Sequence, residues 1–403
     1  MPTTNGLRCA QRVDGGSWCR TLISAAGAVR ISSMRFRSVF TLIFLAALPA
    51  TAHGVIYSVQ DLGDLPGGTD GSSAMDINDL GQVVGYSRTG TGYRAFLWTS
   101  GGGMQNLGDL PGGEDYSYAF AINDLGQVVG YSPAATGTHA FLWTSGGGMQ
   151  DLGYLPGGAD YSVANGINNS GQVVGRRNSS LNTNAFLWTS GGGMQGLGDL
   201  PGGWDFSEAY GINDLGQVVG VSDAATGRRA FLWTSDGGMQ DLGDLAGGSD
   251  YSYANGINNL GQVVGVSDAA TGKHAFLWTS GGGMQDLGYL PGGADYSEAK
   301  CINTAGQVVG VSQSSVGIRA FLWTSDGGMQ DLDSLVGDSD ANWTFLRAAG
   351  INSQGQIVGY GWNPRGATRA FLLTPLPEPS TWGLVLCGLG ALIAPRLARR
   401  RKP

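Results

Sequence analysis

One unit recurs seven times along this chain of 403 residues, and this repetition constrains the fold more than any single motif does. Gly-Gln-Val-Val-Gly begins at Gly81, and five further copies follow at intervals of 45 residues. A seventh copy, Gly-Gln-Ile-Val-Gly, begins at Gly355, 49 residues after the sixth. Ala-Phe-Leu-Trp recurs in the same way from Ala95 and ends as Ala-Phe-Leu-Leu at Ala370. A period of this length is typical of solenoids, arrays and propeller blades.

Each unit is predicted to form four short antiparallel strands. In residues 251–288 the runs YSYANGIN, QVVGVSD, HAFLWTS and MQDLG are separated by clusters of Asn, Asp and Gly. Short apolar, β-branched and aromatic runs that end at turn residues predict strands, and the 71 glycines of the chain disfavour helix. The Asn-Asp-Leu-Gly step resembles a hairpin loop that closes with a left-handed glycine.

Four strands in about 45 residues match the dimensions of a propeller blade. The segment VIYSVQDLG, from Val55, matches the strand that ends each unit, whereas the last unit stops at RAFLLT without that strand. The N-terminal strand can therefore complete the last blade and cover two free sheet edges. We predict an all-β, seven-bladed β-propeller of four-stranded blades over residues 53–374, with a β-solenoid as the alternative.

Residues 34–52 have the features of a secretory signal peptide. Arg35 and Arg37 precede an apolar run, which ends at Ala50-Thr51-Ala52. We predict cleavage after Ala52 and export of the rest of the chain. Residues 1–33 fit no export pattern, so we expect a non-native or unstructured extension, with translation starting at Met34. An unusually long signal n-region is the alternative.

Residues 375–403 combine three features in a fixed order. Pro377-Glu378-Pro379 is followed by an apolar stretch that is short for a membrane span, and then by a basic tail. The tail contains Arg396, Arg399, Arg400 and Arg401, and marks the cytoplasmic side of a membrane. This arrangement closely resembles the PEP-CTERM sorting signal of Gram-negative bacteria. The resemblance implies a short C-terminal transmembrane helix, transient anchoring in the inner membrane and cleavage near the Pro-Glu-Pro motif by an exosortase-type protease. A permanent anchor is the alternative.

The repeats also resemble the HAF family of extracellular repeat proteins. The stretch His-Ala-Phe-Leu-Trp from His274 matches that family's signature, and His-Ala-Phe from His139 is a second literal match. The resemblance covers nearly the whole region between the two terminal signals. It implies an extracellular location and a propeller-like structure, but no activity.

Charge and cysteine content narrow the classes of partner. Residues 53–376 contain 12 Lys and Arg against 29 Asp and Glu, a net charge of −17, which argues against a nucleic acid or an anionic lipid as partner. Cys301 is the single cysteine within the repeats, so neither a disulfide framework nor a paired-thiol metal site can be built there. We interpret Cys301 as a small buried residue in place of the glycine of its sister units.

One aspartate and one asparagine recur in every unit. The aspartates precede a strand, usually after Gly-Gly, and are Asp70, Asp115, Asp160, Asp205, Asp250, Asp295 and Asp340. Two interpretations are open: a ring of calcium or glycan contacts, or turn residues that bind nearby backbone amides. The second is favoured because the placement is the same in every unit, and no cofactor is predicted. The asparagine of each Ile-Asn pair is expected to cap a turn.

The recurring tryptophans of Ala-Phe-Leu-Trp are predicted to lie in the core, because alternation places Phe and Trp on one face of the strand. Sugar-stacking platforms are the alternative. His139 and His274 are expected to face solvent on separate blades. Positions that differ between units are better recognition candidates, because function is often carried by loops on a fixed scaffold. These positions are Tyr93, Trp204, Arg228, Arg229 and the 176–182 loop.

A catalytic site needs several unlike groups that converge once, and repetition supplies the opposite. The leading hypothesis is therefore a non-catalytic, exported surface or extracellular-matrix protein whose propeller binds a polysaccharide or a surface protein. The first alternative is a polysaccharide-active enzyme with a carboxylate pair at the mouth of the ring. A lesser alternative, prompted by the repeated Trp-Thr-Ser, is an ice-binding protein.

Overall fold

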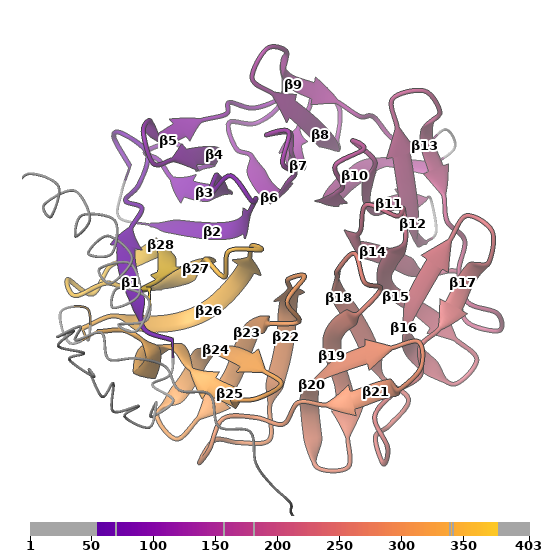
Figure 1. The fold of residues 1–403 in the computed structure, drawn as a ribbon. Coiled ribbons are helices and arrows are strands. Elements are labelled where there is room, and N and C mark those ends of the chain that lie inside the picture. The colour runs from indigo at the N-terminus through magenta and orange to yellow at the C-terminus, as the bar shows by residue number, and fades with distance from the viewer. Residues whose placement is uncertain are drawn as a thin grey trace, which may run out of the picture. The chain divides into compact units, whose positions relative to one another are not determined.

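The computed structural model describes residues 55–68, 71–155, 158–179, 182–337, 340 and 342–377, and Figure 1 shows their arrangement. These residues form 28 strands and one short 3₁₀ helix, η1 (Leu332–Leu335). The strands form seven four-stranded antiparallel units, which we number 1 to 7 in chain order. They are β2 (Ser72–Ile77), β3 (Val83–Arg88), β4 (Tyr93–Thr99) and β5 (Gly103–Asn106); β6 (Tyr118–Ile122), β7 (Val128–Pro133), β8 (Thr138–Thr144) and β9 (Gly148–Asp151); β10 (Gly158–Ile167), β11 (Val173–Ser179), β12 (Thr183–Thr189) and β13 (Gly193–Gly196); β14 (Ser207–Ile212), β15 (Val218–Ala224), β16 (Gly227–Thr234) and β17 (Gly238–Asp241); β18 (Ser252–Ile257), β19 (Val263–Ala269), β20 (Gly272–Thr279) and β21 (Gly283–Asp286); β22 (Ser297–Ile302), β23 (Val308–Ser314), β24 (Gly317–Thr324) and β25 (Gly328–Asp331); and β26 (Thr344–Ile351), β27 (Ile357–Trp362) and β28 (Thr368–Pro375) with β1 (Tyr57–Asp61).

The units surround a common centre, in the manner of a β-propeller (Figure 1). In each unit the first strand lies nearest the centre, and these inner strands are β2, β6, β10, β14, β18, β22 and β26. Units 2 and 3 share one eight-stranded sheet, because Tyr161 of β10 makes a single parallel pairing with Thr138 of β8. The prediction of an all-β fold with four strands per repeat is confirmed.

The N-terminal strand completes the last unit, as the offset between the chain ends predicts. β1 pairs antiparallel with β28, from Tyr57 opposite Pro375 to Asp61 opposite Phe371. The core is continuous across the same junction, because Phe96 and Trp98 of unit 1 pack in one cluster with Leu372 of unit 7. The first and last units are therefore in contact, which the alternative of an open solenoid would not give.

Each repeated residue that the sequence assigns to the scaffold has a packing role. The tryptophans at positions 98, 143, 188, 278 and 323 are 4–8% exposed, and Trp233 packs partly buried in the equivalent cluster. Their assignment to the core is confirmed, and they are not available as sugar-stacking platforms. The second glycine of Gly-Gln-Val-Val-Gly is required for steric reasons. A Cβ on Gly130 would lie 1.8 Å from the carbonyl oxygen of Tyr118 on the inner strand.

The turn after each inner strand is closed by a glycine in the left-handed region, as predicted; Gly81 has a φ of 71°. The asparagine at the start of the turn acts as the expected cap. Oδ1 of Asn78 accepts hydrogen bonds from the backbone amides of Leu80 and Gln82, at 3.1 and 2.9 Å.

The same asparagines also join the units to one another. Nδ2 of each asparagine donates to the backbone carbonyl of the equivalent asparagine in the next unit, at 3.0–3.1 Å, and Nδ2 of Asn352 donates to the carbonyl of Asn78. We call this closed series the asparagine ring; its members are Asn78, Asn123, Asn168, Asn213, Asn258, Asn303 and Asn352. All seven side chains are buried.

Removing one link of the asparagine ring should destabilise the protein. In Asn213→Ala the buried carbonyl of Asn258 and the capped amides of Leu215 and Gln217 lose their partner. We expect a loss of roughly 1–3 kcal/mol or more in the free energy of unfolding. Leu215→Ala, at a side chain that is 70% exposed, is the matched control and should change it by less than about 0.5 kcal/mol. Equal melting curves for the two variants would contradict a structural role for the ring.

Candidate functional site

The two ends of the central channel differ in their chemistry. At one end, which we call the asparagine mouth, the Ile-Asn pairs and the residue after each of them line a cavity of about 200 Å³. Asp76, Asp79, Asp124 and Asp214 are its acidic members. Burial raises the pKa of the Asp76 carboxyl group to about 7, although the backbone amides of Ile122 and Ile77 donate to it at 2.9 Å.

Two positions of each inner strand vary, although the residues around them repeat. The strands share the pattern Ser-x-Ala-x-x-Ile-Asn, except that unit 7 begins with Leu346. The repeated serines and alanines are buried in the sheet packing. The first variable position holds Ser73, Tyr118, Val163, Glu208, Tyr253, Glu298 and Arg347, and the second holds Met75, Phe120, Asn165, Tyr210, Asn255, Lys300 and Ala349.

Many of these variable residues line a second cavity, of about 520 Å³, which we call the tyrosine cavity. Its lining consists of Met75, Phe120, Asn165, Tyr210, Tyr251, Tyr253, Asn255, Val266, Lys273, Tyr296, Glu298, Lys300, Arg347 and Ala349. The cavity therefore draws side chains from all seven units. Its volume is within the range of small-molecule binding sites.

Tyrosine rings form one wall of the cavity. The ring centroids of Tyr251 and Tyr253 lie 4.8 Å apart, and Tyr210 stacks on Tyr253 at 6.5 Å. The hydroxyl of Tyr210 donates to Glu208 at 2.7 Å, and Arg228 donates to the hydroxyl of Tyr253 at 2.9 Å. Burial, together with the nearby Glu208 carboxylate, raises the pKa of Tyr210, so its hydroxyl stays neutral. The wall offers flat aromatic faces with fixed hydroxyl groups at their edges.

Charged and amide side chains lie beside these tyrosines in the cavity lining. Lys300 makes an ion pair with Glu298, which also accepts from Asn255 Nδ2 at 3.1 Å and from the Tyr296 hydroxyl at 3.2 Å. Burial raises the pKa of Glu298, but the cations of Lys300 and Arg347 outweigh it and hold that pKa below its usual value. Burial and the Arg347 charge lower the pKa of Lys300.

A second group of tyrosines lies at the junction of units 1 and 2. Tyr118 contacts the rings of Tyr86, Tyr93, Tyr116 and Tyr131, with centroids 4.8–6.1 Å apart. Together with the 91–92 and 114–115 segments, most of these residues line a cavity of about 450 Å³. Both cavities are thus lined by groups of tyrosine side chains.

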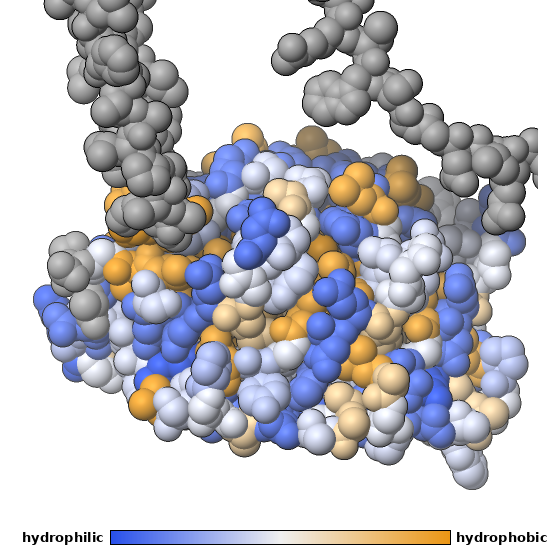
Figure 2. Space-filling model, turned by 60° about the horizontal axis from the view of Figure 1, so that its bottom comes forward, coloured by the Kyte–Doolittle hydropathy of each residue, from blue (hydrophilic) through white to orange (hydrophobic). Residues whose placement is uncertain are grey.

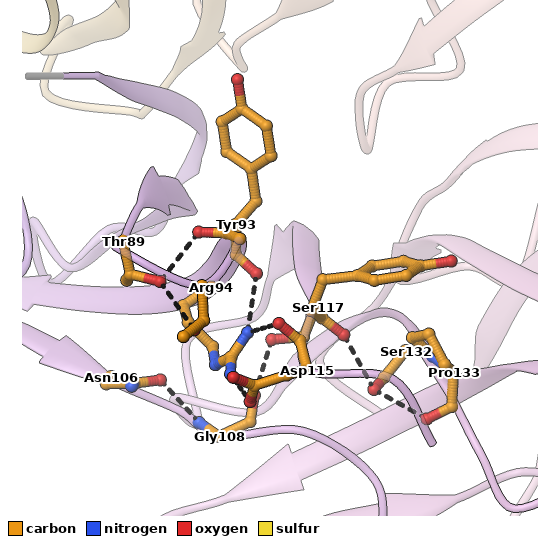
Figure 3. Close-up of polar contacts among 12 residues, drawn as sticks. Thr89, Tyr93, Arg94, Asn106, Gly108, Asp115, Ser117, Ser132 and Pro133 are labelled. Atoms are coloured by element: carbon orange, nitrogen blue, oxygen red, sulfur yellow. Dashed lines mark hydrogen bonds and ion pairs between the residues drawn. The ribbon is translucent and has the colours of Figure 1, made fainter. Parts of the chain in front are cut away.

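The recurring aspartates mostly contact the preceding unit. The partner is the residue just before Ala-Phe-Leu-Trp, 21 positions earlier: Arg94 pairs with Asp115, Asn184 Nδ2 donates to Asp205 at 3.0 Å, and Arg229 pairs with Asp250. Figure 3 shows Arg94 turned toward Asp115, with the ring of Tyr93 pointing away from the contact.

The other recurring aspartates have different partners. Asp160 contacts His139, and Asp295 forms a hydrogen bond with Tyr289. Asp340 Oδ2 accepts from the amide of Val59 at 3.4 Å, and Asp70 lies outside the described residues. The calcium interpretation stays a prediction; within the described ranges, no group of three or more His, Cys, Asp or Glu is arranged to hold a metal ion.

The expectation that the two repeat histidines face solvent is wrong. His139 is 5% exposed and His274 is 6% exposed, and each packs against a tyrosine ring, of Tyr154 and Tyr289 respectively. Nδ1 of His139 lies 2.8 Å from Asp151 and Nε2 lies 2.6 Å from Asp160; Nδ1 of His274 lies 2.8 Å from Asp286. Burial lowers the pKa of His139, but the two carboxylates outweigh it, so the pKa is raised.

The raised pKa of His139 predicts a pH-dependent contribution to stability. The folded state holds the extra proton more tightly than the unfolded chain does, so the stabilisation is complete below the ordinary histidine pKa of about 6.5 and is lost as pH rises through the folded value. His139→Asn introduces the residue found at 184 in the next unit. The melting temperature of the wild type should exceed that of the variant by more at pH 5.5 than at pH 8.5. A constant difference would contradict the ion-paired imidazolium.

The recognition candidates predicted from the sequence have different surroundings. Trp204 is 85% exposed, and Tyr93 lines the cavity between units 1 and 2. Arg228 packs over the Phe206 ring at 4.3 Å and reaches Tyr253. Arg229, which we expected to be free for recognition, is only 7% exposed. It pairs with Asp250 and so links two units.

The 176–182 loop and Cys301 both lie wholly or partly on strands. Much of that loop belongs to β11, where Arg176 pairs with Glu208 at 2.8 Å; residues 180–181 lie outside the described part. Cys301 occupies the place of glycine in four sister units, as interpreted, and is only partly buried.

The predicted terminal signals lie almost wholly outside the described residues. Pro377 is the last residue described; Ala52, Glu378 and Pro379 are not described, nor are Arg396, Arg399, Arg400 and Arg401. Within the described part of the chain, no helix has the length and apolar character needed to span a membrane.

Sequence reasoning missed the tyrosine cavity. It sought variation in loops, whereas the variable residues alternate with buried Ser and Ala on the inner strands. The signal was available, because the first two x positions in Ser-x-Ala-x-x-Ile-Asn change most from unit to unit, while the Ser, Ala, Ile and Asn largely repeat.

No protein-family model matches the chain, and no curated protein does. Among solved structures it is similar to TolB from Acinetobacter baumannii, with 12% identity and a TM-score of 0.43, over 77% of this chain and 66% of the TolB chain. This chain thus spans less than two thirds of that protein. It is also similar to the WD40 β-propeller domain of Doa1, with 12% identity and a TM-score of 0.38, over 80% of this chain and 98% of that domain.

Proposed function

We propose that the protein is an exported, non-catalytic surface or extracellular-matrix protein, in which a closed seven-bladed propeller over residues 53–374 binds a glycan in the tyrosine cavity. The observation that carries the proposal is the placement of the variable inner-strand residues. Most of them line one cavity, while the residues that repeat maintain the packing between units. Variation on a fixed scaffold is the arrangement expected of a recognition site.

The chemistry of the lining favours a sugar. Aromatic faces pack against the apolar faces of sugar rings, and hydroxyl and amide groups can pair with sugar hydroxyls. The cavity contains four tyrosines and the amides of Asn165 and Asn255. The net charge of −17 for residues 53–376 opposes nucleic acid as a ligand. Figure 2 shows that hydrophobic residues on the face in view are interspersed with hydrophilic ones.

The cavity supports binding better than hydrolysis. Glycoside hydrolysis usually needs two carboxyl groups on opposite sides of the scissile bond. Glu298 is the one carboxylate among the described residues that line the cavity, and it is already engaged by Lys300, Asn255 and Tyr296. A polysaccharide-active enzyme is therefore the less favoured function.

Export and sorting belong to the same proposal. Residues 34–52 would direct secretion, with cleavage after Ala52. The PEP-CTERM-like segment at 375–403 would hold the protein transiently in the inner membrane until an exosortase-type protease releases it to the cell surface or the extracellular space. The resemblance of both ends to known signals supports this proposal.

Glycan binding should depend on Tyr253. On a glycan array, the protein should retain a defined set of oligosaccharides. Tyr253→Ala should weaken their binding about tenfold, equivalent to about 1.4 kcal/mol, because it removes the central ring of the aromatic wall. Tyr253→Phe keeps the ring and should lose much less.

Trp204→Ala is the matched control, since Trp204 is exposed but is not part of the cavity lining. Its affinity should equal that of the wild type. A large loss with Trp204→Ala and none with Tyr253→Ala would place recognition on the outer loops. Absence of any bound glycan would contradict the proposed function.

A further inference from the structure

We propose that the tyrosine cavity recognises an acidic glycan, through a salt bridge between a sugar carboxylate and Arg347. This inference rests on the proposed glycan binding and names the class of sugar. The supporting observation is the distribution of positive charge in a strongly acidic domain.

Lys and Arg are absent from the turns at one end of the repeat units. The turns at the asparagine mouth and the neighbouring Trp-Thr-Ser hairpins contain no Lys or Arg in any unit, but they contain Asp79, Asp124, Asp214, Asp236 and Asp326. The tyrosine cavity reverses this balance. Its lining includes Lys273, Lys300 and Arg347 against the single carboxylate of Glu298. A cavity rich in cations inside a domain of net charge −17 attracts an anionic group locally.

Two of the three cations already have partners. Lys273 Nζ lies 3.2 Å from Asp268 and 3.3 Å from the centre of the Tyr251 ring. Lys300 pairs with Glu298. These contacts fix the two lysines in the wall of the cavity and neutralise most of their charge.

Arg347 is different. Within the described part of the chain it makes no ion pair, and its buried Nε has no hydrogen-bond partner. Leaving a buried donor on a charged group unsatisfied costs about 1–3 kcal/mol or more, which a bound anion would recover. The charge of Arg347, like that of Lys300, lowers the pKa of Glu298, and all three residues line the same cavity.

The position of Arg347 suits a chain of sugars. It lines the tyrosine cavity and also a neighbouring cavity of about 580 Å³ between units 6 and 7, which shares Tyr296 and Glu298 with it. Trp362, which is 50% exposed, belongs to that second lining. A ligand can therefore cross from one aromatic surface to another past Arg347.

A carboxylate is the anion that this geometry fits best. The guanidinium presents paired N–H donors that match the two oxygens of a carboxylate. A uronic acid carries such a carboxylate beside a ring that can stack on tyrosine. An acidic peptide offers the same charge, but lacks the run of hydroxyl groups that the tyrosine hydroxyls and Asn amides could bind.

The test measures binding by titration calorimetry with the full chain. The probes are oligosaccharides of galacturonate, glucuronate, mannuronate and guluronate, their carboxyl-reduced neutral forms, and an oligoglutamate peptide. The wild type should bind at least one uronate at least tenfold more tightly than its reduced form, and more tightly than the peptide.

Arg347→Tyr introduces the residue of units 2 and 5, so the inner strand should tolerate it. This variant should lose the preference for the acidic form, so that its affinities for the acidic and the reduced sugar agree within about twofold, a difference of about 0.4 kcal/mol. Arg347→Lys, which keeps the charge but not the paired donors, should show an intermediate preference. Arg88→Tyr removes an equal charge from an exposed site outside the cavity and should change nothing.

Each contrary result has a distinct meaning. Equal binding of acidic and reduced sugars would overturn this inference and leave the proposed function intact. Equal losses in Arg347→Tyr and Arg88→Tyr would also overturn it, because they would indicate general charge attraction. Preference for the peptide would replace the glycan as ligand, and binding of no sugar would overturn the proposed function itself.

Discussion

The asparagine ring is the interaction on which the rest of the structure depends. Each asparagine uses its oxygen to hold its own turn and its nitrogen to hold the next unit, so one side chain fixes both the shape of a unit and its distance from its neighbour. The series closes only because Asn352 reaches Asn78. The pairing of β1 with β28 makes the same closure at the outer edge of the sheet, where an unpaired edge would otherwise remain.

This constraint explains why most of the repeated residues are unsuited to recognition. Phe96 and Trp98 pack with the preceding unit, and the buried serines and alanines of the inner strands fill the sheet packing. The inner strands pass close to the axis to form the ring, and most of their variable side chains line the tyrosine cavity. Those positions are free to vary, and they supply the chemistry of the tyrosine cavity.

Features that depend on one unit, or on the order of units, could be predicted from the sequence. The 45-residue period predicts the four-stranded units, strand alternation predicts the buried tryptophans, and the offset between Val55 and Thr374 predicts the pairing of β1 with β28. Contacts between units could not be predicted in this way. His139 looked exposed because its partner, Asp160, lies 21 residues away in the next unit, and Arg229 looked free for the same reason. The cavity was missed because it exists only when seven strands converge.

The most direct measurement is an experimental structure of the protein with a bound oligouronate. We predict electron density for the sugar in the tyrosine cavity, with a ring against Tyr253 and a carboxylate paired with Arg347. Sugar density on the outer loops around Trp204, or at the asparagine mouth, with an empty tyrosine cavity would contradict this prediction.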